Sequence, residues 1–292
     1  MDLPETYFSD QKEREYITQL RNKKELTPKE VRILNSADAL MKQNIKTILT
    51  SRRIKMFRCV SPDGAYIDFQ SVLTSNSKSV IVLGLLNGIE VVVKWYKGDK
   101  RDCSYEAKIY EDLKEIGCSL PWFCTKFKFL NCQVIAIEKL EKLTVNDEEF
   151  EIGAAVLDQL KYIHKIGVHC DIKPLNIMKR VHKGKTTYFL IDFGGLTTQK
   201  SGHGYKRWLW SPKWCSQKSH TKDQITTAKN DFIELGYTMK AIQNWKIYNG
   251  KDGKYKTGFT GRLAKYKQYV DKLDPYSPMK GNVHDELKTI LK

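Results

Sequence analysis

Four side chains in the second half of the chain could act together on a phosphate group. Asp171 can accept a hydrogen bond from an attacking hydroxyl, and Lys173, two residues further on, can reach a phosphoryl group in transfer. The amide oxygen of Asn176 and the carboxylate of Asp192 are ligands of the kind that Mg²⁺ prefers. The spacing therefore predicts a phosphoryl-transfer site built from two segments, HCDIKPLNIM (169–178) and YFLIDFGG (188–195).

The gap between these two segments fits a short β-hairpin. Its turn is expected at His182-Lys183-Gly184-Lys185, where glycine and polar residues interrupt two β-rich runs. A hairpin reverses the chain direction, so it would return Asp192 to the neighbourhood of Asn176.

The elements that must hold these groups change in type along the chain. Asn87-Gly88 is a strong hairpin signal between two β-rich runs, and the chain becomes mostly helical after Leu143. Strands followed by helices predict an α+β fold with segregated lobes. The expected strands are 80–86, 89–96, 127–130 and 133–140, and the expected helices are 103–116 and 147–165.

The first 65 residues are charged and read as a helical N-terminal extension. Thr27-Pro28-Lys29-Glu30 combines an N-cap threonine, a proline at the first helical position and a glutamate three residues after the cap. Apolar residues then follow at roughly helical spacing to about Thr50. We therefore expect three parts: a helical extension (1–65), a smaller β-rich lobe (66–140) and a larger helical lobe (141–292).

Composition predicts an intracellular protein of the cytoplasm, the nucleus or both. The seven cysteines are an odd number without a Cys-x-x-Cys pair, which fits a reducing compartment. No apolar stretch is long enough to span a bilayer, and the N-terminus has no apolar signal core, so no membrane partner is expected. The net charge of +16 (50 basic and 34 acidic residues) favours anionic partners such as ATP, nucleic acid, or acidic or phosphorylated protein segments.

The two segments with the candidate catalytic groups resemble the catalytic loop and the Asp-Phe-Gly motif of eukaryotic protein kinases. Lys173-Pro174 after the aspartate is similar to the serine/threonine type. The resemblance implies a bilobal α+β kinase-like fold, the cofactors ATP and Mg²⁺, and transfer of the γ-phosphoryl group to a protein hydroxyl. It covers roughly residues 66–245.

Further positions follow from this resemblance. VVVKWY looks like the strand whose lysine binds the α- and β-phosphates, which nominates Lys94, and Glu106 is its expected partner on the next helix, with Glu111 as the rival. VIAIEKL looks like the strand before the adenine-binding hinge, so Ile137 would be the gatekeeper. Glu138 and Leu140 would then offer backbone groups to adenine.

The interval from Lys94 to Glu106 and the Glu-x-Lys-x-Tyr pattern are similar to the casein-kinase-I and vaccinia-related group, and the short C-terminal tail is similar to kinases of large DNA viruses. Downstream, Ser211-Pro212 sits where the family has its Ala-Pro-Glu element, although Lys213 stands in the place of glutamate. NDFIELGYTM resembles the helix whose aspartate bonds the catalytic-loop backbone, which nominates Asp231; an ordinary helix N-cap is its alternative reading.

Two positions depart from the family pattern. The glycine-rich phosphate loop is absent, because LTSNSKS (73–79) occupies its place, and weaker or differently arranged ATP binding is expected. Cys170 replaces the arginine that commonly receives an activation-loop phosphate. Activity without loop phosphorylation is therefore expected, although Thr197, Thr198, Ser201 and Tyr205 are available as sites.

Three other functions fit parts of the sequence. A pseudokinase that binds a partner would explain the missing glycines, but it does not require the full set of catalytic residues. A kinase-fold enzyme for small molecules usually lacks the Lys-Pro pair. Nucleic-acid binding is suggested by the charge and by Trp208, Trp210 and Trp214 among basic residues, although packing of the substrate-facing segment explains them better. The sequence does not specify the oligomeric state.

Overall fold

The computed structural model divides the chain into two compact units. Unit 1 comprises residues 1–107 and 122–139, and unit 2 comprises residues 108–121 and 140–292. The chain passes from unit 1 to unit 2 at Lys139–Leu140. The structure describes residues 27–30, 32, 57–60, 66–75, 79–96, 100–121, 124–129, 132–198, 227–247, 258–274 and 282–292.

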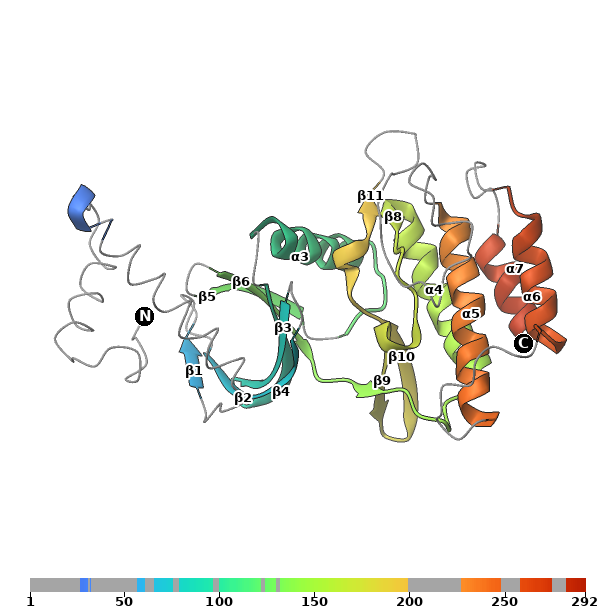
Figure 1. Ribbon diagram of the computed structural model, residues 1–292, viewed down its shortest axis with the longest axis horizontal. Helices are drawn as coiled ribbons and strands as arrows, with labels where there is room; N and C mark the ends of the chain where they lie inside the picture. Colours follow the sequence, from blue (N-terminus) through green and yellow to red (C-terminus); the bar gives the residue numbers. More distant parts are fainter. Residues whose placement is uncertain are drawn as a thin grey trace. The chain divides into compact units, whose positions relative to one another are not determined.

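Unit 1 contains a six-stranded antiparallel sheet (Figure 1). The strand order is β1-β2-β3-β4-β6-β5, so the last two strands exchange their sequence order. Helix α3 (Lys100–Glu115) begins in unit 1 and continues into unit 2. The strands are β1 (Phe57–Val60), β2 (Tyr66–Ser75), β3 (Ser79–Leu86), β4 (Ile89–Tyr96), β5 (Cys124–Phe129) and β6 (Cys132–Glu138).

The predicted hairpin at Asn87-Gly88 is confirmed. Both residues have positive φ, 48° and 84°, and Leu86 pairs with Ile89 across the turn. A two-residue turn with φ above zero at both positions matches the twist of the strands, and asparagine and glycine tolerate that backbone best. The turn fixes the register of β4, which carries Lys94 opposite Ile81.

Strand β1 corrects the predicted N-terminal extension. Residues 57–60 were expected in a helical block but form a strand that pairs with β2, with Phe57 opposite Phe69 and Val60 opposite Tyr66. Four residues at a sheet edge gain backbone hydrogen bonds that a short helix would not provide. The helix start at Thr27 is confirmed: Glu30 N donates to Thr27 Oγ1 (3.3 Å) and Thr27 N to Glu30 Oε2 (2.9 Å). The remaining residues of the 1–56 block lie outside the described part.

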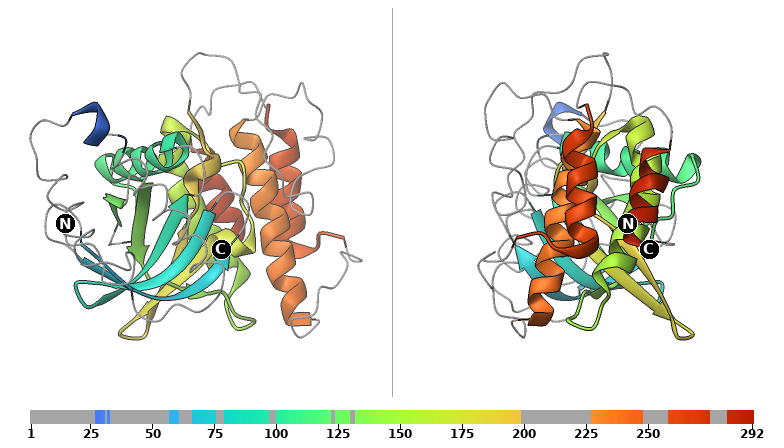
Figure 2. Two further views of the ribbon diagram at one scale, coloured as in Figure 1. Left: turned by 60° about the vertical axis from the view of Figure 1, so that its left-hand side comes forward. Right: turned by 90° about the vertical axis from the view of Figure 1, so that its right-hand side faces the viewer.

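Unit 2 contains helices α4 (Glu149–Ile166), α5 (Ala228–Ile247), α6 (Gly261–Lys272) and α7 (Val283–Leu291). They pack side by side, as Figure 2 shows for α5, α6 and α7. A Cβ at Gly153 of α4 would lie 2.3 Å from Met239 Sδ and 2.9 Å from Leu291 Cδ1, so glycine permits the close approach of α5 and α7. Within the described residues, no helix is both long and apolar enough to cross a membrane.

The second predicted hairpin is also confirmed. Strands β9 (Ile177–His182) and β10 (Lys185–Leu190) pair from His182–Lys185 to Ile177–Leu190, and Lys183 and Gly184 form the turn with φ of 49° and 75°. The short strand β7 (Glu141–Lys142) extends this sheet beside β9. A separate two-stranded pair joins β8 (Gly167–Val168) to β11 (Thr197–Thr198).

Candidate active site

Two of the predicted catalytic residues, Asp171 and Lys173, lie together with the predicted magnesium ligand Asn176 in the loop after β8. Lys173 Nζ lies 2.6 Å from Asp171 Oδ2. Asn176 Nδ2 donates to the carbonyl oxygen of Asp171 (2.9 Å) and to its Oδ2 (3.0 Å). A 3₁₀ turn over Pro174–Asn176 brings the asparagine back toward the aspartate. The loop thus fixes one carboxylate between an ammonium group and an amide.

The β9–β10 hairpin brings the segment with Asp192 to this loop. Ile191 N donates to the carbonyl oxygen of Asn176 (2.9 Å), so the residue before Asp192 is bonded directly to the loop that contains Asp171 and Asn176. Asp192 adopts a left-handed backbone conformation with φ of 67°, which is uncommon for a residue other than glycine. Such strain persists only where the surrounding structure holds it, and it is frequent at functional sites.

Phe193 anchors the same segment in the core of unit 2. Its side chain is fully buried and makes edge-to-face contacts with the rings of Tyr110 (4.8 Å between centroids) and His169 (5.4 Å). Aromatic pairs of this geometry stabilise by about 0.5–1.5 kcal/mol beyond the area that they bury. Phe193 therefore holds the chain on the C-terminal side of Asp192, as the Ile191 bond does on the N-terminal side.

The donor set at this place fits a magnesium ion. Because Asn176 Nδ2 donates to two oxygens of Asp171, the amide oxygen Oδ1 is the atom of Asn176 suited to a cation. Together with the carboxylate of Asp192 it would supply hard oxygen ligands, and Mg²⁺ usually completes its shell with water and substrate phosphates. Among the described residues, no group of three or more His, Cys, Asp or Glu side chains could hold a metal.

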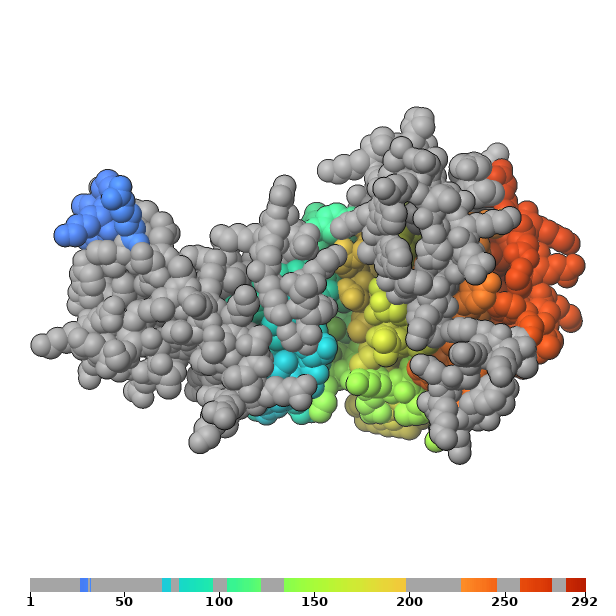
Figure 3. All heavy atoms as spheres, viewed as in Figure 1, coloured from blue at the N-terminus to red at the C-terminus, as the bar shows by residue number. Residues whose placement is uncertain are grey.

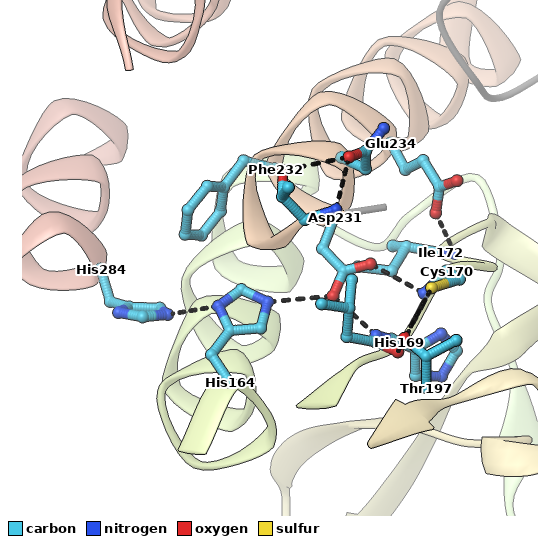
Figure 4. Close-up of polar contacts among 12 residues, drawn as sticks. His164, His169, Cys170, Ile172, Thr197, Asp231, Phe232, Glu234 and His284 are labelled. Atoms are coloured by element: carbon cyan, nitrogen blue, oxygen red, sulfur yellow. Dashed lines mark hydrogen bonds and ion pairs between the residues drawn. The ribbon is translucent and has the colours of Figure 1, made fainter. Parts of the chain in front are cut away.

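Asp231 holds the backbone of the loop that was predicted to be catalytic, and it is not the N-cap of α5. Its Oδ2 accepts a hydrogen bond from His169 N and its Oδ1 one from Cys170 N, both 2.8 Å long (Figure 4). At the start of this helix, Asn230 Oδ1 instead accepts a hydrogen bond from Thr227 N (2.8 Å). Asp231 is completely buried. One carboxylate thus satisfies two buried amides that immediately precede Asp171.

Two further residues of α5 continue this support and were not identified from the sequence. Ile172 N donates to Glu234 Oε2 (2.7 Å), and Thr238 Oγ1 donates to the carbonyl oxygen of Ile172 (3.1 Å). Burial, together with the charge of Asp231, raises the pKa of Glu234 well above its usual range. Residues 231, 234 and 238 share one face of a helix, and this spacing of polar residues was the available signal.

His169 connects Asp171 to the segment before Asp192. Its Nδ1 accepts a hydrogen bond from Asp171 N (3.3 Å), and its Nε2 donates to the carbonyl oxygen of Ile191 (3.3 Å). Burial lowers the pKa of His169, which agrees with a neutral ring that donates at one nitrogen and accepts at the other. The residue therefore joins the two segments from which the candidate site was predicted.

Cys170 is buried and bonded locally. Its Sγ donates to the carbonyl oxygen of Val168 (3.3 Å) and lies 3.7 Å from Thr197 Oγ1. Its φ is 65°, a left-handed conformation. The residue at this position is thus a neutral group turned into the β8–β11 region.

Lys94 of β4 pairs with Glu106 of α3 within unit 1. The distance from Lys94 Nζ to Glu106 Oε2 is 2.7 Å, and Tyr96 OH donates to the same oxygen. Glu106 is buried, whereas its predicted rival Glu111 is exposed. Tyr96 was not identified from the sequence, although residues 94 and 96 of one strand necessarily point to the same face.

The predicted hinge residues lie at the end of β6. Ile137 pairs with Val92 inside the sheet, and Glu138 is buried at the last position of the strand. Leu140 follows as the first residue of unit 2 and is buried as well. A role for Glu138 and Leu140 in adenine binding stays a prediction. Residues 76–78 of the segment in place of the glycine-rich loop, Ser211-Pro212, Lys213 and the three tryptophans lie outside the described residues.

Comparison with known proteins gives a match of structure alone. No protein-family model matches the sequence, and no curated protein matches it significantly. Among solved structures, that of vaccinia related kinase 3 is similar, with a TM-score of 0.56 and 14% sequence identity over 86% of this chain and 94% of that chain. At this level of identity the similarity shows the fold, and this chain has a protein-kinase-like fold.

Proposed function

We propose that the chain is a serine/threonine protein kinase that transfers the γ-phosphoryl group of ATP to protein hydroxyls. The observation that carries the proposal is the cluster of Asp171, Lys173 and Asn176 within hydrogen-bonding distance of one another. The kinase-like fold and the bond between Asn176 and the chain before Asp192 support it. Kinase catalysis relies on positioning and electrostatics, which such a fixed cluster can provide.

In this mechanism Asp171 would accept the hydrogen bond of the substrate hydroxyl and orient its oxygen toward the phosphoryl group. Lys173, whose ammonium group lies beside that carboxylate, would balance the charge of the phosphoryl group during transfer. Asn176 would keep the Asp171 carboxylate in one orientation through its amide. Bound Mg²⁺, held by Asn176 and Asp192, would supply neutralisation of the phosphate oxygens.

Lys94 would bind the α- and β-phosphates of ATP. Glu106 and Tyr96 favour this role, because a carboxylate bonded from two sides holds the lysine in a defined direction. Glu138 and Leu140 would contact adenine through their backbone groups. The excess of basic residues favours substrates that are acidic or already phosphorylated.

The test is transfer of labelled γ-phosphate from Mg-ATP to a panel of acidic and basic proteins, with Asp171→Ala alongside. We expect label on serine or threonine and a fall of about 10²–10⁴-fold in the variant, the usual contribution of such a group. Unchanged melting temperature and circular dichroism of the variant would show that it is folded. Equal transfer by both proteins would contradict the assigned role of Asp171.

A pseudokinase is the second candidate, and the segment 73–79 favours it. This stretch has no glycine, and β2 continues to Ser75 while β3 begins at Ser79, so little chain is left to close over phosphates. Absence of transfer, together with absence of a nucleotide-induced shift in melting temperature, would favour this alternative. Nucleotide binding without transfer would separate loss of chemistry from loss of the site.

A further inference from the structure

A chain of hydrogen bonds links the C-terminal helix to the residue that holds the catalytic loop. His284 Nε2 of α7 lies 3.0 Å from His164 Nδ1 of α4, and His164 Nε2 lies 2.9 Å from Asp231 Oδ2 (Figure 4). The side chains of His164 and Asp231 are 4% and 0% exposed, and His284 is 9% exposed. All three groups are therefore withdrawn from water.

Packing fixes both imidazole rings. The ring of Phe232 is nearly perpendicular to that of His164 (5.2 Å, 82°) and lies 5.3 Å from that of His284. Helix α7 is held on α4 by ion pairs of Lys161 with Asp285 (2.8 Å) and of Lys288 with Asp158 (2.5 Å). In the space-filling view the C-terminal helices, coloured red, form part of the outer surface of unit 2 (Figure 3). A peripheral helix thus reaches the centre of this unit through one side chain.

The hydrogen-bond partners define which nitrogen atoms carry protons. His284 also forms a hydrogen bond with the backbone of Leu160. Because Nε2 of His284 faces His164, this second bond uses Nδ1. The available backbone partner is the carbonyl oxygen, so Nδ1 donates. Burial, with the nearby charges of His164 and Lys161, lowers the pKa of His284 to about 4, so its ring is neutral near neutral pH. A neutral ring that donates from Nδ1 must accept at Nε2.

His164 must then donate from both ring nitrogens. Its Nδ1 donates to His284 Nε2, and its Nε2 donates to the carboxylate of Asp231. A ring with two N–H groups is an imidazolium cation. Among the described residues, no lysine or arginine bonds Asp231, so His164 is the counter-ion of a fully buried carboxylate.

We propose that His284 is a positioning residue of the catalytic loop. By accepting from His164 Nδ1 it keeps His164 doubly protonated and paired with Asp231, the carboxylate that bonds the amides of His169 and Cys170. The consequence for catalysis rests on the proposed kinase function; the consequence for the loop does not. The charged and titratable groups around the two rings are Lys161, Asp231 and Asp285, and Glu234, Tyr266 and His169 in turn interact with Asp231.

The direct test is a ¹⁵N NMR measurement of the histidine side chains in the full-length protein near neutral pH. We expect both nitrogens of His164 to be protonated and His284 to carry one proton, on Nδ1. Loss of the acceptor in His284→Leu should shift His164 to a form with a single ring N–H. A neutral His164 in the unmodified protein would overturn the proposal, whether or not any variant folds.

Amide hydrogen exchange measures the effect on the loop. In His284→Leu we expect the amides of His169 and Cys170 to exchange about tenfold faster or more, since weakening of a local bond lowers the opening free energy. His284→Gln keeps an acceptor oxygen near the position of Nε2 and should retain most of the protection. Lys288→Ala, which removes an exposed ion pair of the same helix, is the matched control and should leave both amides protected.

Kinetics of phosphoryl transfer separate positioning from general loosening of the fold. His284→Leu should lower kcat by about tenfold with little change in the KM for ATP, because a displaced catalytic aspartate affects the transition state more than nucleotide binding. His284→Gln should restore most of kcat, and Lys288→Ala should match the unmodified protein. Unchanged exchange and unchanged kcat in a folded His284→Leu protein would overturn the proposal. A protein without any kinase activity would refute the proposed function only, because exchange and NMR still report on His284.

Discussion

The ammonium group of Lys94 lies 2.7 Å from Oε2 of Glu106, and the hydroxyl of Tyr96 donates to that same oxygen. Lys94 and Tyr96 point from one face of β4, whereas Glu106 comes from α3. The buried carboxylate is thus bonded to two donors of a rigid strand. This arrangement ties the position of α3 to the direction of the lysine side chain.

Replacement of Glu106 tests that relationship. We expect Glu106→Gln to lower kcat/KM for ATP about 10–100-fold, because the lysine loses its charge-assisted bond and its fixed direction. Glu111→Gln is the matched control, since Glu111 is an exposed glutamate of the same helix. Steady-state kinetics with varied ATP would measure both. Equal losses in the two variants would mean that the pairing has no functional role.

Replacement of Asp231 tests the support of the catalytic loop. Asp231→Asn keeps one carbonyl oxygen but loses the second acceptor and the charge that faces His164, so we expect the free energy of unfolding to fall by about 2–4 kcal/mol. Urea denaturation would measure the change. Asn230→Ala removes only the side-chain oxygen that caps the start of the same helix and should cost about 1 kcal/mol. A smaller loss for Asp231→Asn than for the cap variant would contradict this account.

The protonation of His284 predicts how stability changes with pH. Its pKa is about 4 in the folded protein against an ordinary value of 6.5, so the unfolded chain binds more protons between these values. The contribution of His284 to the free energy of unfolding should therefore be complete above about pH 6.5 and should be lost as the pH drops toward 4. After allowance for solvent screening, this residue should account for about 1–2 kcal/mol.

Urea denaturation of the unmodified protein and of His284→Gln at pH 7 and pH 4.5 would isolate this contribution, because glutamine does not titrate and keeps an acceptor for His164. The buried His169, whose pKa is also lowered, acts in the same direction, but it is present in both proteins and cancels in the comparison. The variant should lose less stability on acidification. An identical loss in the two proteins would show that His284 does not titrate as described.

Cys170, which precedes the proposed catalytic aspartate Asp171, predicts activity without loop phosphorylation. The thiol of Cys170 is buried against Val168 and Thr197, where a phosphate-binding arginine would be expected in the resembling family. Kinase assays before and after phosphatase treatment, with dephosphorylation checked by mass spectrometry, would test this. We expect the same kinase activity before and after phosphatase treatment. Loss of activity after treatment would contradict the hypothesis.

Asn244 of α5 predicts a stabilising substitution. The residue is 3% exposed. Among the described residues, neither its Nδ2 nor its Oδ1 has a hydrogen-bond partner. Asn244→Leu should raise the free energy of unfolding by about 1 kcal/mol, because it removes a desolvated polar group at similar volume. Gln243→Leu is a useful contrast, since Gln243 accepts from buried Lys240 (3.2 Å) and its loss should destabilise. Thermal unfolding of both variants would show whether each substitution raises or lowers the stability.

The sequence by itself determined the local features of this protein. Both hairpin turns were predictable because Asn87-Gly88 and Lys183-Gly184 include residues that tolerate positive φ. The catalytic-loop cluster was predictable because Asp171, Lys173 and Asn176 lie within six positions of one another. Short-range geometry leaves few alternatives at such distances, and the periodicity of β4 and α4 likewise specified their type.

Only the tertiary structure decided which distant polar groups meet. His164 and His284 are separated by 120 positions and His164 and Asp231 by 67, and each could equally have been an exposed polar residue of an amphipathic helix. The strand β1 was missed because Phe57–Val60 lie beyond the helical spacing, which ends near Thr50, and only their pairing with β2 makes them a strand. Helix packing and strand pairing depend on the whole core, and they turn isolated polar residues into the supports of the candidate site.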